Sequence, residues 1–195
     1  MKVIIKLILI FIFLSSCQKT KIAENFTLLP TVKNLEYNGK LSVFDCNSEF
    51  NYYSESNELP VLLSQKLKLK KGTANKHNLS FEIDSELDTA DEGYHLHISK
   101  ENIKIRAKDK AGLFYSFISL NQLITDSKDQ NINLPIVSIE DFPSLKNRSI
   151  HIDVKHHTEK KEYYFELIDE LAYLKINGII IEFEDKLGYQ KRPIV

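Results

Sequence analysis

The chain has 195 residues, of which 43% are hydrophobic and 27% are charged, and its formal net charge at pH 7 is -1. This composition is sufficient for a globular core of one domain, or of one domain and part of another. The balanced charge provides no basic surface for a phosphate backbone, which excludes DNA and RNA as expected partners.

The first sixteen residues have the layout of a secretory signal peptide. Lys2 and Lys6 precede an unbroken apolar run over residues 7–14. This run is much shorter than the roughly 18 to 20 apolar residues that a membrane-spanning helix requires. We therefore expect residues 1–16 to be removed after export, and we expect any permanent anchor to come from elsewhere.

The leader closes on Leu14-Ser15-Ser16-Cys17, which resembles the bacterial lipobox, where small residues precede a cysteine that receives a diacylglycerol. The resemblance implies that Cys17 is the lipidated N-terminus of a lipoprotein in the bacterial cell envelope, at the outer membrane or the cell surface. The alternative is a plain signal peptide followed by an incidental cysteine. Cys46, the other cysteine, is expected to be a buried lone thiol.

A folded α/β domain is expected over residues 28–143. Residues 18–25 are polar and lack apolar periodicity, so the segment 17–27 is interpreted as a lipidated tether. Apolar residues recur mostly at helical spacing over residues 59–69, which predicts a helix. Residues 111–124 place a wide apolar stripe on one helical face, which predicts a second helix buried against a sheet.

The strands of this domain are expected where apolar and polar residues alternate. This period-two pattern occurs over residues 78–83, 94–98 and 102–106. The short polar connection 99–101 predicts that the last two strands form an antiparallel hairpin. The domain is therefore expected to have an α+β arrangement, an antiparallel-rich sheet packed with helices.

Two histidines in the middle strand raise the question of a metal. His95 and His97 are two residues apart on a strand and point the same way, which would permit a shared ion. The alternation places them on the solvent face, and no carboxylate or cysteine cluster accompanies them. We expect no metal site and no cofactor.

A different pattern follows the turn signal Asp141-Phe142-Pro143. Residues 149–154 predict a strand, 160–174 an amphipathic helix and 178–183 a second strand, which together make a βαβ unit. Because residues 178–181 form a continuous apolar run, both faces of this strand are expected to be covered, as in a parallel sheet or a barrel.

Several short motifs follow one another in a particular order and spacing. They are Leu29-Pro30, Glu92-Gly93-Tyr94-His95-Leu96-His97-Ile98, Ala111-Gly112-Leu113-Phe114-Tyr115-Ser116 with Leu120 and Gln122-Leu123, and Ile139-Glu140-Asp141-Phe142-Pro143. They resemble the N-terminal domain of family 20 glycoside hydrolases, the β-N-acetylhexosaminidases. Residues 147–154 and 174–177 similarly resemble the opening of that family's catalytic TIM barrel, and residues 181–189 look most like its hexosaminidase D branch. The resemblance implies that residues 144–195 form the first βαβ unit of an incomplete (β/α)8 barrel.

The resemblance also implies sugar-binding residues. Arg148 matches the arginine that binds hydroxyls of the terminal sugar, with a structural ion pair as the alternative. Asp153 lies near the end of its expected strand, where a polar group supports a pocket. Glu182 and Asp185, together with Glu184, cluster after the second strand as candidate partners of sugar hydroxyls, with a solvated acidic loop as the alternative.

In this family the acetamido oxygen of the substrate attacks the anomeric carbon, an aspartate orients that group, and an adjacent glutamate donates the proton. The pair follows barrel strand four, and a whole barrel needs roughly 200 residues or more. The chain is therefore expected to be the N-terminal portion of a lipid-anchored exo-acting hydrolase that removes terminal N-acetylhexosamine from glycans, inactive alone because the catalytic pair is missing. The alternative is a non-catalytic truncated lipoprotein that serves as a structural or glycan-binding module.

Overall fold

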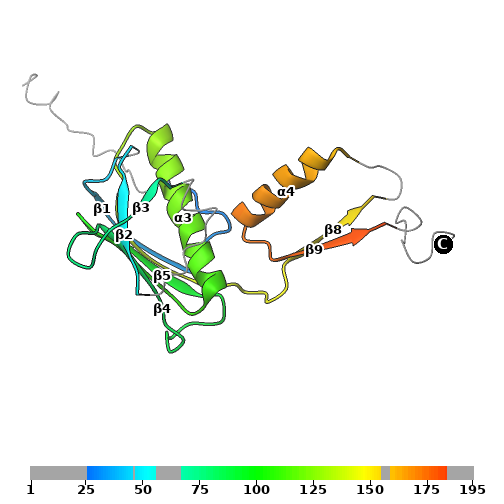
Figure 1. Cartoon of the computed structure of the whole chain (residues 1–195), viewed down its shortest axis with the longest axis horizontal. Helices are drawn as coiled ribbons and strands as arrows, with labels where there is room; N and C mark the ends of the chain where they lie inside the picture. The colour runs from blue at the N-terminus through cyan, green and yellow to red at the C-terminus, as the bar shows by residue number, and fades with distance from the viewer. Residues whose placement is uncertain (1–25, 46, 56–66, 155–158, 184–195) are drawn as a thin grey trace, which may run out of the picture.

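The computed structural model describes residues 26–45, 47–55, 67–154 and 159–183 (Figure 1). These residues form a seven-stranded sheet crossed by one long helix, followed by a smaller unit of two strands and one helix. Within this part of the chain, no helix is long and apolar enough to cross a membrane. The expected leader, Cys17, Cys46 and Asp185 lie outside the described residues.

The large sheet is mixed. Its strands are β1 (Asn34–Leu41), β2 (Phe50–Tyr53), β3 (Leu69–Lys71), β4 (Leu79–Ile83), β5 (Tyr94–Ile98), β6 (Ile103–Ala107) and β7 (Pro135–Asp141), in the spatial order β1-β7-β5-β6-β4-β2-β3. The pairs β1–β7, β5–β7 and β5–β6 are antiparallel, which confirms the expected hairpin. The pairs β4–β6, β2–β4 and β2–β3 are parallel, so the sheet is not dominated by antiparallel pairing.

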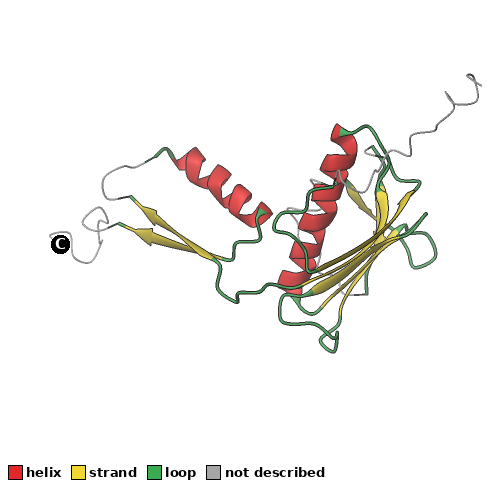
Figure 2. Ribbon diagram, turned by 180° about the vertical axis from the view of Figure 1, so that it is seen from behind, coloured by secondary structure: helices red, strands yellow, loops and turns green. Residues whose placement is uncertain are grey.

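Helix α3 (Lys110–Asp129) covers one face of this sheet, as Figure 2 shows from behind. It contains the predicted helix 111–124 and continues for more than a turn beyond it. Strand β5 turns Tyr94, Leu96 and Ile98 toward the helix, because successive side chains of a strand point to opposite faces. The core therefore lies between α3 and one face of the sheet.

The start of α3 is held by a side-chain cap. Asp109 Oδ1 accepts a hydrogen bond from the Gly112 amide at 2.8 Å, and its Oδ2 accepts one from the Glu92 amide, also at 2.8 Å. The cap therefore satisfies one of the free amides of the first helical turn and also ties the helix to the loop before β5.

One predicted helix is wrong at its end. Most of residues 59–69 lies outside the described residues, but Leu69 begins strand β3 and pairs with Phe50.

At the start of the domain, Phe26 and Thr27 already contact the fold. The Phe26 ring lies 6.1 Å from that of Tyr37, and the Thr27 amide donates to Asp126 Oδ2 at 2.7 Å.

The smaller unit consists of β8 (Ser149–Asp153), α4 (Lys161–Tyr173) and β9 (Gly178–Glu182), with β8 and β9 parallel and in register. This confirms the predicted strand, helix and strand. The expected burial of both faces of the second strand is not observed. The exposed fractions of Ile179, Ile180 and Ile181 are 37%, 59% and 45%, so the described part of the chain covers these side chains only in part.

Candidate functional site

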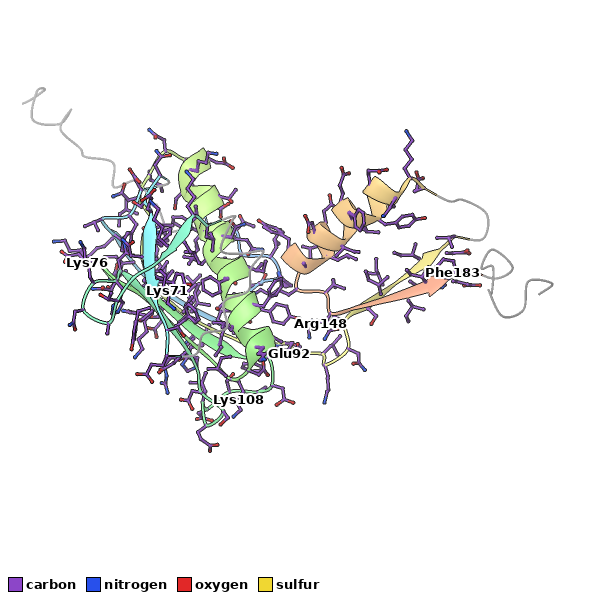
Figure 3. The ribbon with its side chains drawn as sticks, viewed as in Figure 1. Lys71, Lys76, Glu92, Lys108, Arg148 and Phe183 are labelled. Atoms are coloured by element: carbon purple, nitrogen blue, oxygen red, sulfur yellow. The ribbon has the colours of Figure 1, made fainter. Side chains whose placement is uncertain are left out.

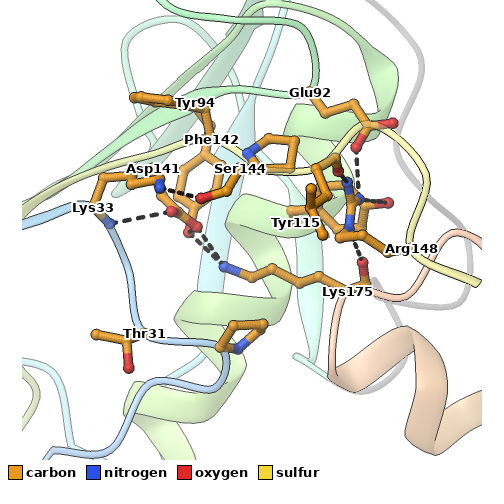
Figure 4. A pocket seen from close by; sticks show the side chains of 13 residues that line it. Thr31, Lys33, Glu92, Tyr94, Tyr115, Asp141, Phe142, Ser144, Arg148 and Lys175 are labelled. Carbon is orange, nitrogen blue, oxygen red and sulfur yellow. Dashed lines mark hydrogen bonds and ion pairs between the residues drawn. The ribbon is translucent and has the colours of Figure 1, made fainter.

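Charged side chains meet where the smaller unit joins the large sheet (Figure 3). A cavity of about 210 Å³ lies at this junction, between β5, the end of β7, the loop that leads to β8 and the loop that leads to β9. Figure 4 shows the thirteen residues that line it. They are Pro30, Thr31, Lys33, Glu92, Tyr94, Tyr115, Asp141, Phe142, Pro143, Ser144, Leu145, Arg148 and Lys175.

Arg148, a predicted sugar ligand, directly precedes β8 and forms an ion pair with Glu92. Its Nη2 donates to Glu92 Oε2 at 2.6 Å and to the Tyr115 hydroxyl at 3.0 Å. Its Nε donates to the Lys175 carbonyl at 2.8 Å, and its Nη1 to the Leu145 carbonyl at 2.7 Å. These four bonds use four of the five guanidinium N–H groups, and the Arg148 side chain is only 13% exposed.

The local backbone fixes Glu92 in this pair. Glu92 has a positive φ of 62°, and Gly93 follows it. A side chain at Gly112 would place its Cβ 2.3 Å from the Gly93 carbonyl oxygen, so this turn and the start of α3 approach each other more closely than any larger residue allows. Together with the Asp109 cap, this contact holds the Glu92 carboxylate toward Arg148.

A second ion pair, which the sequence did not predict, lies deeper at the junction. Lys175 Nζ donates to Asp141 Oδ2 at 2.8 Å and to the Tyr94 hydroxyl at 2.9 Å. That hydroxyl donates in turn to Asp141 Oδ2 at 3.1 Å and lies 2.7 Å from Ser119 Oγ. All four residues are buried, and Lys175 is only 6% exposed. Buried charges persist in proteins when they are paired and hydrogen-bonded in this way.

This burial changes the titration of the network. Loss of solvent lowers the pKa of Lys175, although the carboxylate of Asp141 opposes that change. Burial raises the pKa of Tyr94 well above its ordinary value, and the negative charge of Asp141 raises it further. In the folded protein the Tyr94 hydroxyl therefore loses its proton at a higher pH than a solvated tyrosine does, because its pKa is raised.

The other predicted ligands lie at the opposite end of the small unit. Asp153 ends β8 and is the direct partner of Glu182 at the end of β9. Glu182 Oε2 also lies 3.0 Å from His151 Nε2. At roughly 3.3 Å per strand residue, Arg148 is about 16 Å from Asp153 along the chain. The structure thus brings Asp153 and Glu182 together and places Arg148 apart from them.

The two histidines of β5 lie on the face of the sheet opposite α3. His97 is exposed, and its Nδ1 lies 2.8 Å from Ser138 Oγ on the neighbouring strand β7. His95 is partly exposed, and in the strand register it lies opposite Glu140 of β7 and Arg106 of β6. The described residues contain no group of three or more histidine, cysteine, aspartate or glutamate side chains arranged to hold a metal ion.

The free energy of unfolding is expected to fall as the pH rises above about 10. Burial raises the pKa values of Tyr37, Tyr94, Tyr115 and Tyr173. A raised folded pKa contributes stability that is complete below the unfolded pKa and is lost as the pH passes the folded one. Lys175 acts in the opposite direction, since its lowered pKa makes stability rise with pH up to about 10.4, the pKa of lysine in the unfolded chain. Above that pH the Lys175 contribution no longer changes, and the raised tyrosine pKa values alone lower the stability further.

Urea unfolding between about pH 9 and 11 measures this loss. Tyr94→Phe lowers stability at every pH because it removes a partner of Lys175, but it should make the alkaline decline shallower. An unchanged slope in this variant would contradict the assignment of the decline to Tyr94.

Comparison with known proteins identifies relatives of the domain that contains the seven-stranded sheet and α3. Residues 26–142 match glycosyl hydrolase family 20, domain 2. A beta-hexosaminidase of Vibrio vulnificus is 35% identical over 119 residues, which cover 61% of this chain and 14% of that protein. A beta-N-acetylhexosaminidase of Cellulomonas fimi is 28% identical over 108 residues, which cover 55% of this chain and 22% of that protein. The chain therefore matches less than a quarter of the length of either relative.

Solved structures extend the likeness beyond the large sheet. The crystal structure of a beta-N-acetylhexosaminidase from Bacteroides fragilis superposes with a TM-score of 0.67 at 26% identity, covering 79% of this chain and 32% of that one. An exo beta-N-acetylglucosaminidase from Vibrio harveyi, solved with N-acetylglucosamine, gives 0.66 at 24% identity, covering 85% and 27%. The smaller coverage equals about 154 of the 195 residues, so the matches extend past residue 142.

Proposed function

Because this chain belongs to glycosyl hydrolase family 20, we propose that it provides the N-terminal domain and the first barrel unit of an exo-acting β-N-acetylhexosaminidase. The observation that carries the proposal is a parallel β8–α4–β9 unit directly after a domain that matches family 20, and the share of the chain that superposes on a family structure supports it. A strand, a crossover helix and a parallel strand are the repeating element of a (β/α)8 barrel. The apolar side chains on both faces of β9 fit a strand whose faces are covered by other parts of a barrel.

The proposed substrates are glycans that end in N-acetylhexosamine. Support comes from the relatives, which are named as hexosaminidases, and from the Vibrio harveyi structure, which was solved with N-acetylglucosamine. We assign the reaction to substrate assistance, in which the acetamido oxygen attacks the anomeric carbon and a glutamate protonates the leaving oxygen. The aspartate and glutamate of that step are proposed to lie on later barrel strands, which these 195 residues do not include.

Within this chain, Asp153, Glu182 and Asp185 are the proposed contributors to the sugar site. Active sites of (β/α)8 barrels lie at the C-terminal ends of the strands, and Asp153 and Glu182 occupy those ends of β8 and β9. Carboxylate oxygens in that place can accept hydrogen bonds from sugar hydroxyls. Arg148 is also a proposed ligand, through the guanidinium N–H group that its four hydrogen bonds leave over.

We further propose that the protein is exported and held at the bacterial cell envelope by a lipid on Cys17. The support is the sequence alone, namely the short apolar run and the Leu14-Ser15-Ser16-Cys17 motif. A lipid anchor would hold the enzyme close to glycans outside the cell, and Cys17→Ser should move the protein from the membrane fraction to the soluble fraction.

The test is hydrolysis of 4-nitrophenyl N-acetyl-β-D-glucosaminide by membranes from cells that carry the gene at its own locus. We expect nitrophenol release that disappears when the gene is disrupted, and no turnover by the purified 195-residue chain. Turnover by that chain would contradict a catalytic pair outside it. If the complete gene product neither hydrolyses the glycoside nor contains an adjacent aspartate and glutamate, the enzymatic proposal fails. Calorimetry with N-acetylglucosamine oligomers then tests whether the protein is a glycan-binding module.

A further inference from the structure

The contact between the large sheet and the smaller unit is polar. Leu171 is the one buried residue that α4 contributes among its described residues. Phe165 and Ile168 of the same helix are 57% and 47% exposed, and the isoleucines of β9 are also exposed. Within the described chain, the smaller unit therefore buries few apolar side chains, Leu171 and Val154 among them.

Two ion pairs cross the junction instead. Lys175 binds Asp141, and Arg148 binds Glu92, with nitrogen–oxygen distances of 2.8 Å and 2.6 Å. All four side chains are at most 21% exposed. Asn177 adds a bond from its Nδ2 to Glu92 Oε1 at 3.3 Å, and its Oδ1 accepts from the Arg148 amide at 2.9 Å.

The residues that the smaller unit contributes to these contacts lie just before its two strands. Arg148 directly precedes β8, and Lys175 and Asn177 lie three residues and one residue before β9. The Arg148 guanidinium also donates to the Lys175 carbonyl, which links the two strand entrances to each other. Both ion pairs therefore hold the N-terminal ends of two neighbouring parallel strands, away from Asp153 and Glu182.

We propose that these two ion pairs form an interdomain latch, defined as Lys175–Asp141 and Arg148–Glu92, that sets the position of the β8–α4–β9 unit on the large sheet. Asp141 and Glu92 provide the two carboxylates of the N-terminal domain. Lys175 and Arg148, which lie just before β9 and β8, provide the two cations. Because the latch is directional and buried, any displacement of the unit would leave charges unpaired. These contacts lie inside this chain and are independent of the proposed hydrolase activity.

If β8 and β9 are barrel strands, the latch also determines the end of the barrel against which the N-terminal domain lies. The N-terminal ends of barrel strands contribute to stability, whereas the C-terminal ends carry the active site. The domain would then dock at the stability face, and loss of the latch would affect the folding of the first strands before it affected the sugar site.

Hydrogen exchange of the full chain, followed by mass spectrometry, tests the latch. Lys175→Met leaves the Asp141 carboxylate buried without its cation, so peptides that contain β8 and β9 should exchange on the order of 100-fold faster. Peptides that contain β5 and β6 should keep their rates. The double variant Lys175→Met/Asp141→Leu should exchange no faster than either single variant, because no unpaired charge remains.

Two further variants keep the test decisive if Lys175→Met fails to fold. Asn177→Ala removes bonds to the latch without burying a charge and should accelerate β8 and β9 about fivefold. Lys70→Met breaks an exposed ion pair with Glu49 and should change these peptides less than about twofold. The latch is refuted if β8 and β9 are unaffected by Asn177→Ala, if β5 accelerates equally, or if the Lys175 and Asp141 effects multiply.

Discussion

Replacing Phe117 with alanine is expected to lower the free energy of unfolding by about 3–5 kcal/mol. Phe117 is fully buried at the middle of α3, and its ring meets the Phe81 ring of β4 edge-on, at a centroid distance of 5.6 Å and an angle of 77°. Phe81 in turn stacks on Tyr52 of β2 at 5.7 Å. Truncation would leave a cavity between the helix and these aromatic rings, which the rigid sheet cannot refill.

Urea unfolding of the full chain measures this loss, and Phe114→Ala is the matched control. Phe114 lies on the same helix but is only partly buried, so its truncation should cost about 1–2 kcal/mol. Equal losses for the two variants would show that the contact between α3 and β4 is not the centre of the core.

Local periodicity predicts β4, β5, β6 and α3 of this core, but it does not predict β2 and β7, which contribute Phe50, Val137 and Ile139. Strands β4, β5 and β6 each bury one face and leave the other more exposed, and their residues alternate accordingly. Helix α3 is buried more widely, since residues 115–120 are all buried, but its apolar residues still recur at helical spacing. Strand β1 was not predicted because it is an edge strand whose residues are mostly exposed, so its sequence lacks alternation. The mixed order of the sheet was also not predicted, since it depends on pairings between strands that are distant in the chain.

The candidate site could be predicted only in part. The parallel pairing of Asp153 with Glu182 follows from the βαβ pattern, and Arg148 was identified with an ion pair as one of two alternatives. The sequence marks Asp141 as part of a turn signal and of a family motif, and Lys175 as part of a second motif that follows a helix, but neither residue is predicted to form a buried ion pair. Their mutual burial arises because the two segments meet across the junction, a long-range contact that no local pattern encodes.

Arg148→Ala is expected to lower the free energy of unfolding by about 3–5 kcal/mol, the range for removing one partner of a buried ion pair. The change removes four hydrogen bonds and leaves the Glu92 carboxylate, which is 21% exposed, without its cation. Arg148→Lys keeps the charge, but one ammonium group cannot reach acceptors on Glu92, Tyr115 and Leu145 at once, so it should recover less than half of the loss.

A double-mutant cycle with Glu92→Ala isolates the pair from the other bonds of Arg148. We expect the double variant to be more stable than the sum of the two single losses predicts, by about 1–3 kcal/mol. For the hydrolase proposed above, the same variants would separate docking from sugar binding. If Arg148 acts only in the latch, Arg148→Lys should leave KM for the aryl glycoside unchanged at a temperature where it is fully folded. If its remaining N–H group also binds a sugar hydroxyl, KM should rise in Arg148→Lys and stay unchanged in Asn177→Ala, which weakens the same latch without altering the guanidinium.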